Sequence, residues 1–286
     1  MINNIKDFIK AYWLYILPHH LISRLTYILT RTNHPLKNFL INIYIKMFGV
    51  NMNECEITSI DKYETFCDFF TRKLKKGIHK VDNRKKIITS PCDGKILEFG
   101  EIKNNSIVQI KGKYISVESI LNYDKELAYL YKDGSYVTFY LSPKDYHRVH
   151  MPYDGNLHKT IHIPGRLFSV AAHGVKMIKS LYSVNERLVC SFKNDKTNFS
   201  VIFVGAINVS SIEVNWKGEI SPPYPKKTIT TSYSKKLITI KKGCEVGMFK
   251  TGSSVILLFD KNIKPISNVK RGKLIRMGEA IAEIKN

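Results

Sequence analysis

The chain has 286 residues, 44% hydrophobic and 24% charged, which is typical of a folded soluble or peripheral protein with one substantial core and at most a small appended domain. Its formal net charge of +21 favours an anionic partner, either nucleic acid or an acidic membrane surface, although an AT-rich genome could also inflate the lysine count. The five cysteines contain no C-x-x-C pair and follow no secretory signal, which argues against a disulfide framework or a zinc site and favours reduced thiols in a cytosolic compartment.

Residues 1–60 are predicted to form amphipathic helices. Apolar and aromatic residues recur there at spacings of three to four, beginning with Ile5, Phe8, Ile9, Tyr12 and Trp13. Further helices are predicted over 21–30 and 36–48. The longest stretch without a charged residue, 11–23, is too short and too broken by Pro18 to cross a bilayer. We therefore expect a membrane-associating segment that lies in the interface, the alternative being that these apolar faces simply cover the main domain.

From about residue 87 the pattern becomes mostly β. Short runs rich in Val, Ile, Phe and Tyr occur at 136–141, 187–192, 199–209, 237–240 and 255–259, and a helical pattern intervenes at 117–121. Two segments, 242–247 and 271–279, each place a basic residue and Gly at a turn, then an apolar residue and a second Gly. This cadence resembles the hairpins of lipoyl or biotinyl carrier barrels. The predicted fold is therefore α+β, with N-terminal amphipathic helices over 1–60 and, over 61–286, a β-rich catalytic domain with lipoyl/biotinyl-carrier-like barrel character.

Two histidines stand in the run Leu-Ser-Pro-Lys-Asp-Tyr-His-Arg-Val-His-Met-Pro, residues 141–152. The run follows a strand and contains Pro143 and Pro152, so His147 and His150 are predicted on a turn or loop at a strand end. Histidine is the natural proton-transfer group near neutral pH. Zinc is an alternative use of two histidines and a carboxylate, but no further ligand stands at helix-type spacing, so no metal is expected. A single histidine most often has a structural role. Two histidines in one dense run of Asp, Tyr and Arg favour a chemical role instead.

Two weaker elements gain meaning beside these histidines. Asp93, in the run Ser-Pro-Cys-Asp-Gly-Lys at 90–95, would by itself be a turn former between strands. Ser253 follows Gly252 and precedes the apolar run 255–259. Asp93, His150 and Ser253 together are the parts of a nucleophilic triad. Ser253 is not in a G-x-S-x-G elbow, since it lacks the second glycine and precedes a strand instead of a helix.

At this point the chain resembles the phosphatidylserine decarboxylase proenzymes, a pyruvoyl-dependent family of bacterial type. The resemblance runs from the N-terminal helices almost to the C-terminus, with the right order and spacing. Its motifs are LSPKDYHRVHMP at 141–152, PCDG at 91–94, FKTGSS at 249–254, PGRLFSV at 164–170 and NER at 185–187. Departures are small: Cys92 stands where alanine is common, and Thr251 where Leu or Val is usual.

The resemblance implies self-cleavage between Gly252 and Ser253. Ser253 would attack the carbonyl of Gly252, with His150 as base and Asp93 as the residue that orients it, and the resulting ester would undergo β-elimination. The products would be a β chain, 1–252, and an α chain, 253–286, with Ser253 converted into a covalent pyruvoyl group. That group would form a Schiff base with phosphatidylserine and accept electrons as CO₂ leaves, giving phosphatidylethanolamine. His147 would serve this second reaction.

Further expectations follow from the same resemblance. Tyr140 and Ser169 are predicted to bind substrate. The partners would be phosphatidylserine in an anionic membrane and the two chains themselves, as a heterodimer or a homodimer of heterodimers, with no nucleic acid. The enzyme would be peripheral, on the cytoplasmic face of the cell membrane, where basic residues favour anionic lipid.

Two other functions remain as alternatives. A lipid-directed serine hydrolase could use Asp93, His150 and Ser253 without converting them. A basic nucleic-acid-binding module is suggested by the charge alone, since no recognition helix, RNA-binding aromatic signature or zinc finger is evident.

Overall fold

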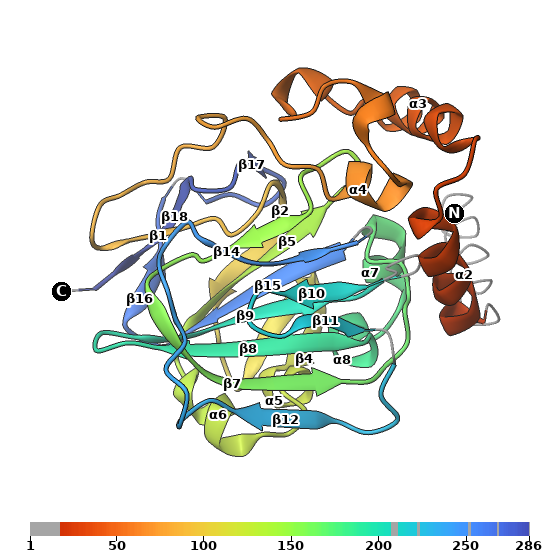
Figure 1. Ribbon diagram of the computed structural model, residues 1–286. Helices are drawn as coiled ribbons and strands as arrows, with labels where there is room; N and C mark the ends of the chain where they lie inside the picture. The colour runs from red at the N-terminus through yellow and green to blue at the C-terminus, as the bar shows by residue number, and fades with distance from the viewer. Residues whose placement is uncertain (1–17, 207–210, 222–223, 251–252, 268, 286) are drawn as a thin grey trace.

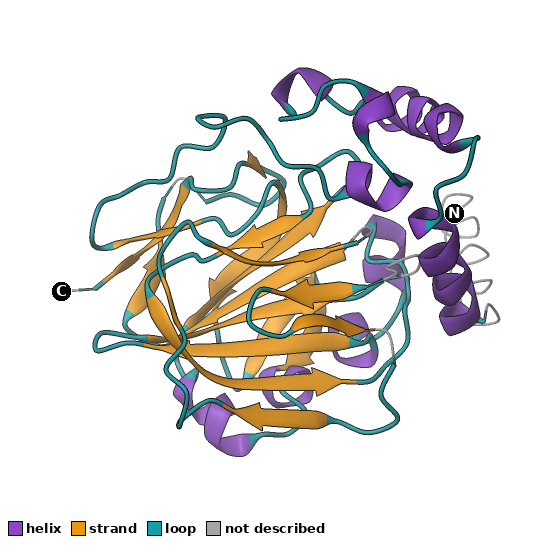
Figure 2. Ribbon diagram, viewed as in Figure 1, coloured by secondary structure: helices purple, strands orange, loops and turns teal. Residues whose placement is uncertain are grey.

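The structure is a computed structural model that describes residues 18–206, 211–221, 224–250, 253–267 and 269–285. Helices gather at one end of a β-rich core, and short helices lie along the core's edges (Figures 1 and 2). The predicted α+β fold with helices at the front is therefore confirmed. The helix predicted around residues 5–13 lies outside the described residues.

The N-terminal helices match the remaining helical predictions closely. The helical elements are α2 (His19–Arg31), α3 (Lys37–Phe48), η1 (Met52–Glu54), η2 (Ile60–Lys62), α4 (Phe66–Phe70), α5 (Val117–Ile120), α6 (Lys125–Leu130), α7 (Ala172–Met177) and α8 (Leu181–Val184). Gly49 ends α3 in the left-handed region at φ 70°, where its N–H donates to Ile45. A capping box between Thr65 and Asp68 starts α4. No helix in the described ranges is long and apolar enough to cross a membrane.

The helical part continues past residue 60 and has a small core of its own. Buried Ile41, Val50, Tyr63 and Phe69 pack together there. Both Tyr63 and Phe69 follow the predicted domain boundary, so the chain leaves the helical part near the end of α4. The division of the chain into domains stays a prediction.

Antiparallel sheets form the core. The largest has the strand order β12 (Ile229–Ser232), β7 (Gly155–Ile163), β8 (Arg187–Lys193), β9 (Asn198–Val204), β15 (Ser253–Phe259), β5 (Ser135–Leu141), β2 (Gly94–Glu101) and β17 (Leu274–Ile275), with β13 (Thr239–Ile240) also on β7. A second joins β11 (Gly218–Ser221), β10 (Ile212–Val214), β14 (Glu245–Phe249) and β6 (Arg148–His150). Others join β1 (Ile87–Thr89), β18 (Ala280–Ile284) and β16 (Ile263–Pro265), and β3 (Ser106–Ile110) with β4 (Lys113–Ser116).

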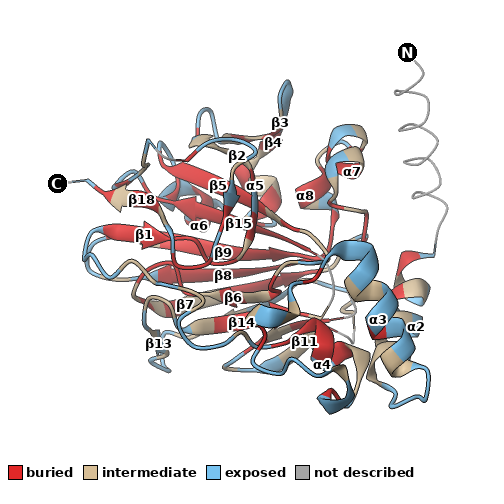
Figure 3. Cartoon of the chain, turned by 90° about the horizontal axis from the view of Figure 1, so that it is seen from above, coloured by how far each residue is buried: buried red, intermediate tan, exposed pale blue. Residues whose placement is uncertain are grey.

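Strand β15 lies in the middle of the largest sheet. Every residue from Ser253 to Phe259 is buried, as Figure 3 shows for the strand as a whole. It pairs with β5 on one side and with β9 on the other. A run of β-branched and aliphatic residues buried on both faces is what such a central position selects. The predicted strand at 255–259 is confirmed, and it begins two residues earlier than predicted because both serines join the pairing.

No closed barrel is found among the described residues. The two segments with the carrier-like cadence end in different places: 242–247 leads into β14, which pairs with β6, whereas 271–279 contains β17 at the edge of the largest sheet. Because their strands do not pair with each other, the two turns do not close one barrel. The barrel character therefore stays a prediction.

Candidate active site

The histidine run begins where β5 ends, beside the start of β15. Ser253 pairs with Leu141, the last residue of β5. Ser253 is 0% exposed, and its Oγ has no hydrogen-bond partner. A buried hydroxyl without a hydrogen-bond partner costs stability, and the adjacent Ser254 shares this feature. What sets Ser253 apart is its pairing with Leu141, where the histidine run begins.

The loop after β5 is held by several polar contacts. The Oδ2 of Asp145 accepts hydrogen bonds from the N–H and the Oγ of Ser142, each at 2.7 Å. Arg72, which follows α4 and is 5% exposed, donates to the carbonyls of Lys144 (2.6 Å) and Asp145 (3.3 Å). Burial raises the pKa of Asp145, although its bonds to Ser142 oppose this. These contacts fix the loop against α4 and so position the histidine that follows.

His147 lies at the same end of the sheet as Ser253. Its Nε2–H donates to the carbonyl of Ser142 at 3.1 Å, and its ring stacks on Phe70 at 4.3 Å between centroids. A carbonyl can only accept, so the other nitrogen, Nδ1, carries the lone pair, and it is buried without a partner. Burial, followed by the charge of Arg72, lowers the pKa of His147 to about 3, so the ring is neutral at neutral pH.

His150 closes the short strand β6 instead of lying on a loop, because β14 offers a pairing partner for residues 148–150. Its Nδ1–H donates to the carbonyl of Gly243 at 2.9 Å, and the hydroxyl of Tyr146 donates to its Nε2 at 3.1 Å. Burial lowers the pKa of His150, although the Gly243 carbonyl works in the opposite direction. His150 is thus held as a neutral base whose lone pair on Nε2 is capped by Tyr146.

Asp93 immediately precedes β2 and contacts a residue that no motif singled out. The Nε2–H of His79 donates to its Oδ1 at 2.7 Å, and the backbone N–H of Met277 donates to the same oxygen at 2.8 Å. A side chain at the next residue, Gly94, would clash with the carbonyl oxygen of Tyr140, so only glycine lets β2 approach β5 here. The Asp-Gly pair is therefore part of the site's construction and not only a turn.

The predicted triad residues are brought to one region but are not joined to one another. Among the described residues, no hydrogen bond links Asp93, His150 and Ser253. The carbonyl of Gly243, and not Asp93, orients the imidazole of His150. His79 was missed because it stands in an irregular stretch, 71–86, with no recognisable pattern around it. The neighbouring Cys92 is buried, and burial raises the pKa of its thiol well above the usual value, which makes it unreactive.

A cavity of about 360 Å³ lies between the N-terminal helices and the end of β5. It is lined by Thr26, Thr30, Tyr44, Phe48, Phe66, Phe70, Tyr140, Leu141, Pro143, Ser169, Val170, Ala171 and Ala206. Tyr140 and Ser169 are both among these residues. Leu141, the pairing partner of Ser253, and Phe70, which stacks on His147, also reach this cavity, so it adjoins the candidate site. Its mostly apolar lining is suited to a hydrophobic ligand.

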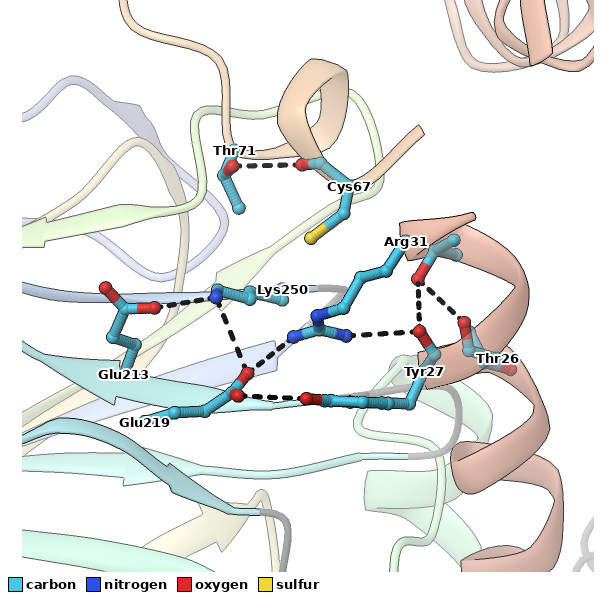
Figure 4. Close-up of polar contacts among 9 residues, drawn as sticks. Thr26, Tyr27, Arg31, Cys67, Thr71, Glu213, Glu219 and Lys250 are labelled. Carbon is cyan, nitrogen blue, oxygen red and sulfur yellow. Dashed lines mark hydrogen bonds and ion pairs between the residues drawn. The ribbon is translucent and has the colours of Figure 1, made fainter. Parts of the chain in front are cut away.

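An ion-pair network ties α2 to the strands beside the site (Figure 4). Arg31 of α2 contacts Glu219 at 2.5 Å, and Tyr27 donates to the same carboxylate at 3.1 Å. Lys250, just after β14, contacts Glu213 at 2.7 Å and Glu219 at 3.4 Å. Burial works to raise the pKa of Glu219, but hydrogen bonding and these cations lower it overall. Part-buried networks of this kind fix geometry better than isolated surface pairs do.

Much of α2 and α3 is exposed (Figure 3), and the exposed residues include large apolar ones. On α2 these are Leu21, Leu25, Ile28 and Leu29; the last three follow Leu21 by four, seven and eight residues and hence share one face with it. On α3 they include Phe39, Leu40, Ile43 and Met47. No group of three or more histidine, cysteine or acidic residues in the described ranges is arranged to hold a metal ion.

Comparison with known proteins links this geometry to one family. The family model described as phosphatidylserine decarboxylase matches residues 66–283, and a second, described as PSD, matches 9–49. A phosphatidylserine decarboxylase proenzyme of Francisella philomiragia is 44% identical over 260 residues, 90% of this chain and 91% of the relative. One of Alkalilimnicola ehrlichii is 42% identical over 277 residues, 96% of each chain.

Proposed function

Because the chain belongs to the phosphatidylserine decarboxylase family, we propose that it converts phosphatidylserine to phosphatidylethanolamine through a pyruvoyl group made by its own cleavage between Gly252 and Ser253. Its relatives are named as proenzymes of this decarboxylase. The observation that carries the proposal is Ser253, whose hydroxyl is fully buried without a partner at the end of the sheet where the histidine run begins.

Self-cleavage would use groups that the chain itself supplies. Ser253 Oγ attacks the carbonyl carbon of Gly252 and gives its proton to His150, the amide bond breaks, and an ester forms. Loss of the α-proton of residue 253 then expels the Gly252 carboxylate. Water replaces the remaining nitrogen, which leaves as ammonia, so that residue 253 ends as the pyruvoyl group. His150 can accept this proton only after its Nε2 is released from the hydroxyl of Tyr146. Asp93 would then stabilise the charged imidazole.

The two chains should stay together after cleavage. The α chain would begin with β15, which pairs on one side with Phe139 and its neighbours in β5 and on the other with β9, both in the β chain. It would also contain β18, which pairs with β1. Removing a central strand would expose two sheet edges and a fully buried apolar run, so the heterodimer should be stable without a covalent link.

Mass analysis of the purified protein tests this proposal. We expect two chains that end at Gly252 and begin at a blocked residue 253, that elute together in native buffer, and that separate only in denaturant. An unmodified Ser253 in a single chain of 33.0 kDa that hydrolyses lipids would contradict the proposal and favour the serine hydrolase.

For decarboxylation, the pyruvoyl group would supply a carbonyl system that accepts the electron pair left when CO₂ departs. His147 is suited to work beside it, because its Nδ1 has a buried lone pair with no competing partner. At neutral pH this neutral ring could accept a proton or a hydrogen bond. Its stacking on Phe70 and its bond to Ser142 hold the ring in one orientation.

The lipid substrate would reach the site through the cavity behind α2 and α3. Tyr140 and Ser169 offer hydroxyl groups in an otherwise mostly apolar lining, as a lipid with a polar headgroup requires. The exposed apolar faces of α2 and α3 would lie in the membrane interface, and the net charge of +21 would favour anionic lipid. On this basis we propose a peripheral enzyme on the cytoplasmic face of the cell membrane.

Charged substitutions on α2 should weaken membrane binding. Leu25 and Leu29 are 51% and 71% exposed and one helical turn apart. Replacing either by Glu should reduce binding to phosphatidylserine vesicles at least about tenfold, since an apolar contact is lost and an anionic group is added. Cosedimentation with vesicles measures this. Leu237→Glu is the matched control, because Leu237 is 80% exposed and stands two residues before β13 in the chain. Figure 3 shows β13 on the opposite side of the molecule from α2. Equal loss in the control, or preference for nucleic acid over vesicles, would contradict docking through α2.

A further inference from the structure

His79 is a buried imidazole at the site that none of the proposed steps uses. It lies in the irregular segment between α4 and β1. Its side chain is 8% exposed, and that of its partner Asp93 is 16% exposed. The contact between His79 Nε2 and Asp93 Oδ1 is 2.7 Å, a normal length for a hydrogen bond to a carboxylate.

The Asp93 carboxylate would have other partners if His79 released it. Asp93 lines a cavity of about 400 Å³ that is also lined by Arg72, Lys144 and Arg276. The backbone N–H of Met277 holds the same Oδ1 as His79, and one backbone bond leaves the carboxylate free to rotate. Coulomb attraction would draw a loosely held carboxylate toward these cations and out of its present position.

His79 also contacts the residue that caps His150. Its ring packs on that of Tyr146 at 5.1 Å between centroids, and Tyr146 stacks on His150 at 5.6 Å. The Tyr146 hydroxyl donates to His150 Nε2 at 3.1 Å. His79 is therefore the described side chain that contacts both Asp93 and the tyrosine holding the proposed base.

We propose that His79 is a positioning residue for self-cleavage, which fixes the Asp93 carboxylate in place by donating a hydrogen bond to its Oδ1. This inference rests on the proposed function, because it takes Asp93 and His150 as members of the cleavage machinery. His79 itself forms no bond with the reacting atoms.

Two amide substitutions separate the hydrogen bond from the bulk of the side chain. Gln places its amide nitrogen near the position of Nε2 and can still donate to Asp93, whereas Asn places its amide near Nδ1 and cannot reach. The full chain is synthesised in vitro, and the appearance of the 253–286 chain is followed over time. We expect His79→Asn to slow cleavage about tenfold and His79→Gln to restore most of the rate.

Controls make either outcome decisive. His158→Ala removes a histidine of β7 away from the site and should cleave at the wild-type rate. Thermal midpoints of both amide variants, measured on chains that also carry Ser253→Ala, compare their folding without the complication of cleavage. The inference is overturned if His79→Asn cleaves as fast as wild type, or if His79→Gln is as slow as His79→Asn at a similar thermal midpoint.

Asp93→Ala in the same assay distinguishes the role of His79 from the role of Asp93. If Asp93→Ala blocks cleavage while His79→Asn cleaves normally, the proposed role of His79 is ruled out and that of Asp93 stands. Wild-type cleavage in Asp93→Ala would remove the role of Asp93 itself, and with it this part of the proposed function.

Discussion

Replacing Ser253 by alanine should leave one uncleaved chain of 33.0 kDa without decarboxylase activity. Alanine has no nucleophilic oxygen, so no ester can form at Gly252 and no pyruvoyl group can arise. The loss should be complete and not graded, because the same atom is needed both for cleavage and for the group that it creates. Denaturing electrophoresis shows the chain, and release of CO₂ from phosphatidylserine reports the activity.

This variant should fold as well as the parent chain. Ser253 Oγ is buried without a partner, so removing it breaks no hydrogen bond and relieves the cost of a desolvated hydroxyl. Ser254 is a matched control, since it is also 0% exposed, has no partner for its Oγ, and points to the opposite face of the same strand. We expect Ser254→Ala to cleave. Cleavage in Ser253→Ala, or equal loss in both variants, would contradict the role assigned to Ser253.

Replacing His150 by alanine should block cleavage, whereas replacing His147 should allow some cleavage but impair decarboxylation. A general base contributes about 10²–10⁴-fold to a rate, so cleavage of His150→Ala should fall by that order. The Nε2 lone pair of His150 is already selected by the bond from Nδ1–H to Gly243, and only the Tyr146 hydroxyl must move away before it can accept a proton.

The two rates must be measured separately. Cleavage is followed by the appearance of the 253–286 chain, and decarboxylation is expressed per cleaved molecule. His147→Ala should then show a low rate per cleaved molecule. Two equally uncleaved variants would refute this division of roles. Loss of cleavage only in His147→Ala would reverse the two roles. That outcome would have a physical basis, because His147 lies beside Ser142 and the start of β15.

Local sequence signals predicted the elements that carry the site. The apolar run 255–259 is a central strand because an aliphatic run of that length is stable only when buried on both faces. The helices at 19–31 and 37–48 follow their apolar spacing. The prediction that both histidines lie on a loop was wrong for His150, because the short strand β6 depends on β14, almost 100 residues further along the chain.

Contacts between distant residues were beyond such signals. Asp93 was predicted to orient His150, but its carboxylate bonds to His79 and to the backbone at Met277, while the Gly243 carbonyl orients the imidazole. Every residue has a backbone carbonyl, so the residue type does not reveal which carbonyl will orient a histidine. His79 stands in a stretch without periodicity. Neither partner could be recognised from the chain alone.

By itself, the sequence determined the kind of chemistry: a serine after glycine, two histidines in one run and an aspartate in a turn, in the order of a self-processing decarboxylase. Only the tertiary structure decided which nitrogen of each histidine holds a proton, which side chain holds Asp93, and that Ser253 is buried without a partner. The reason is physical. Residue types limit which reactions are available, whereas hydrogen-bond partners and burial, which set protonation and orientation, depend on strands brought together from across the whole chain.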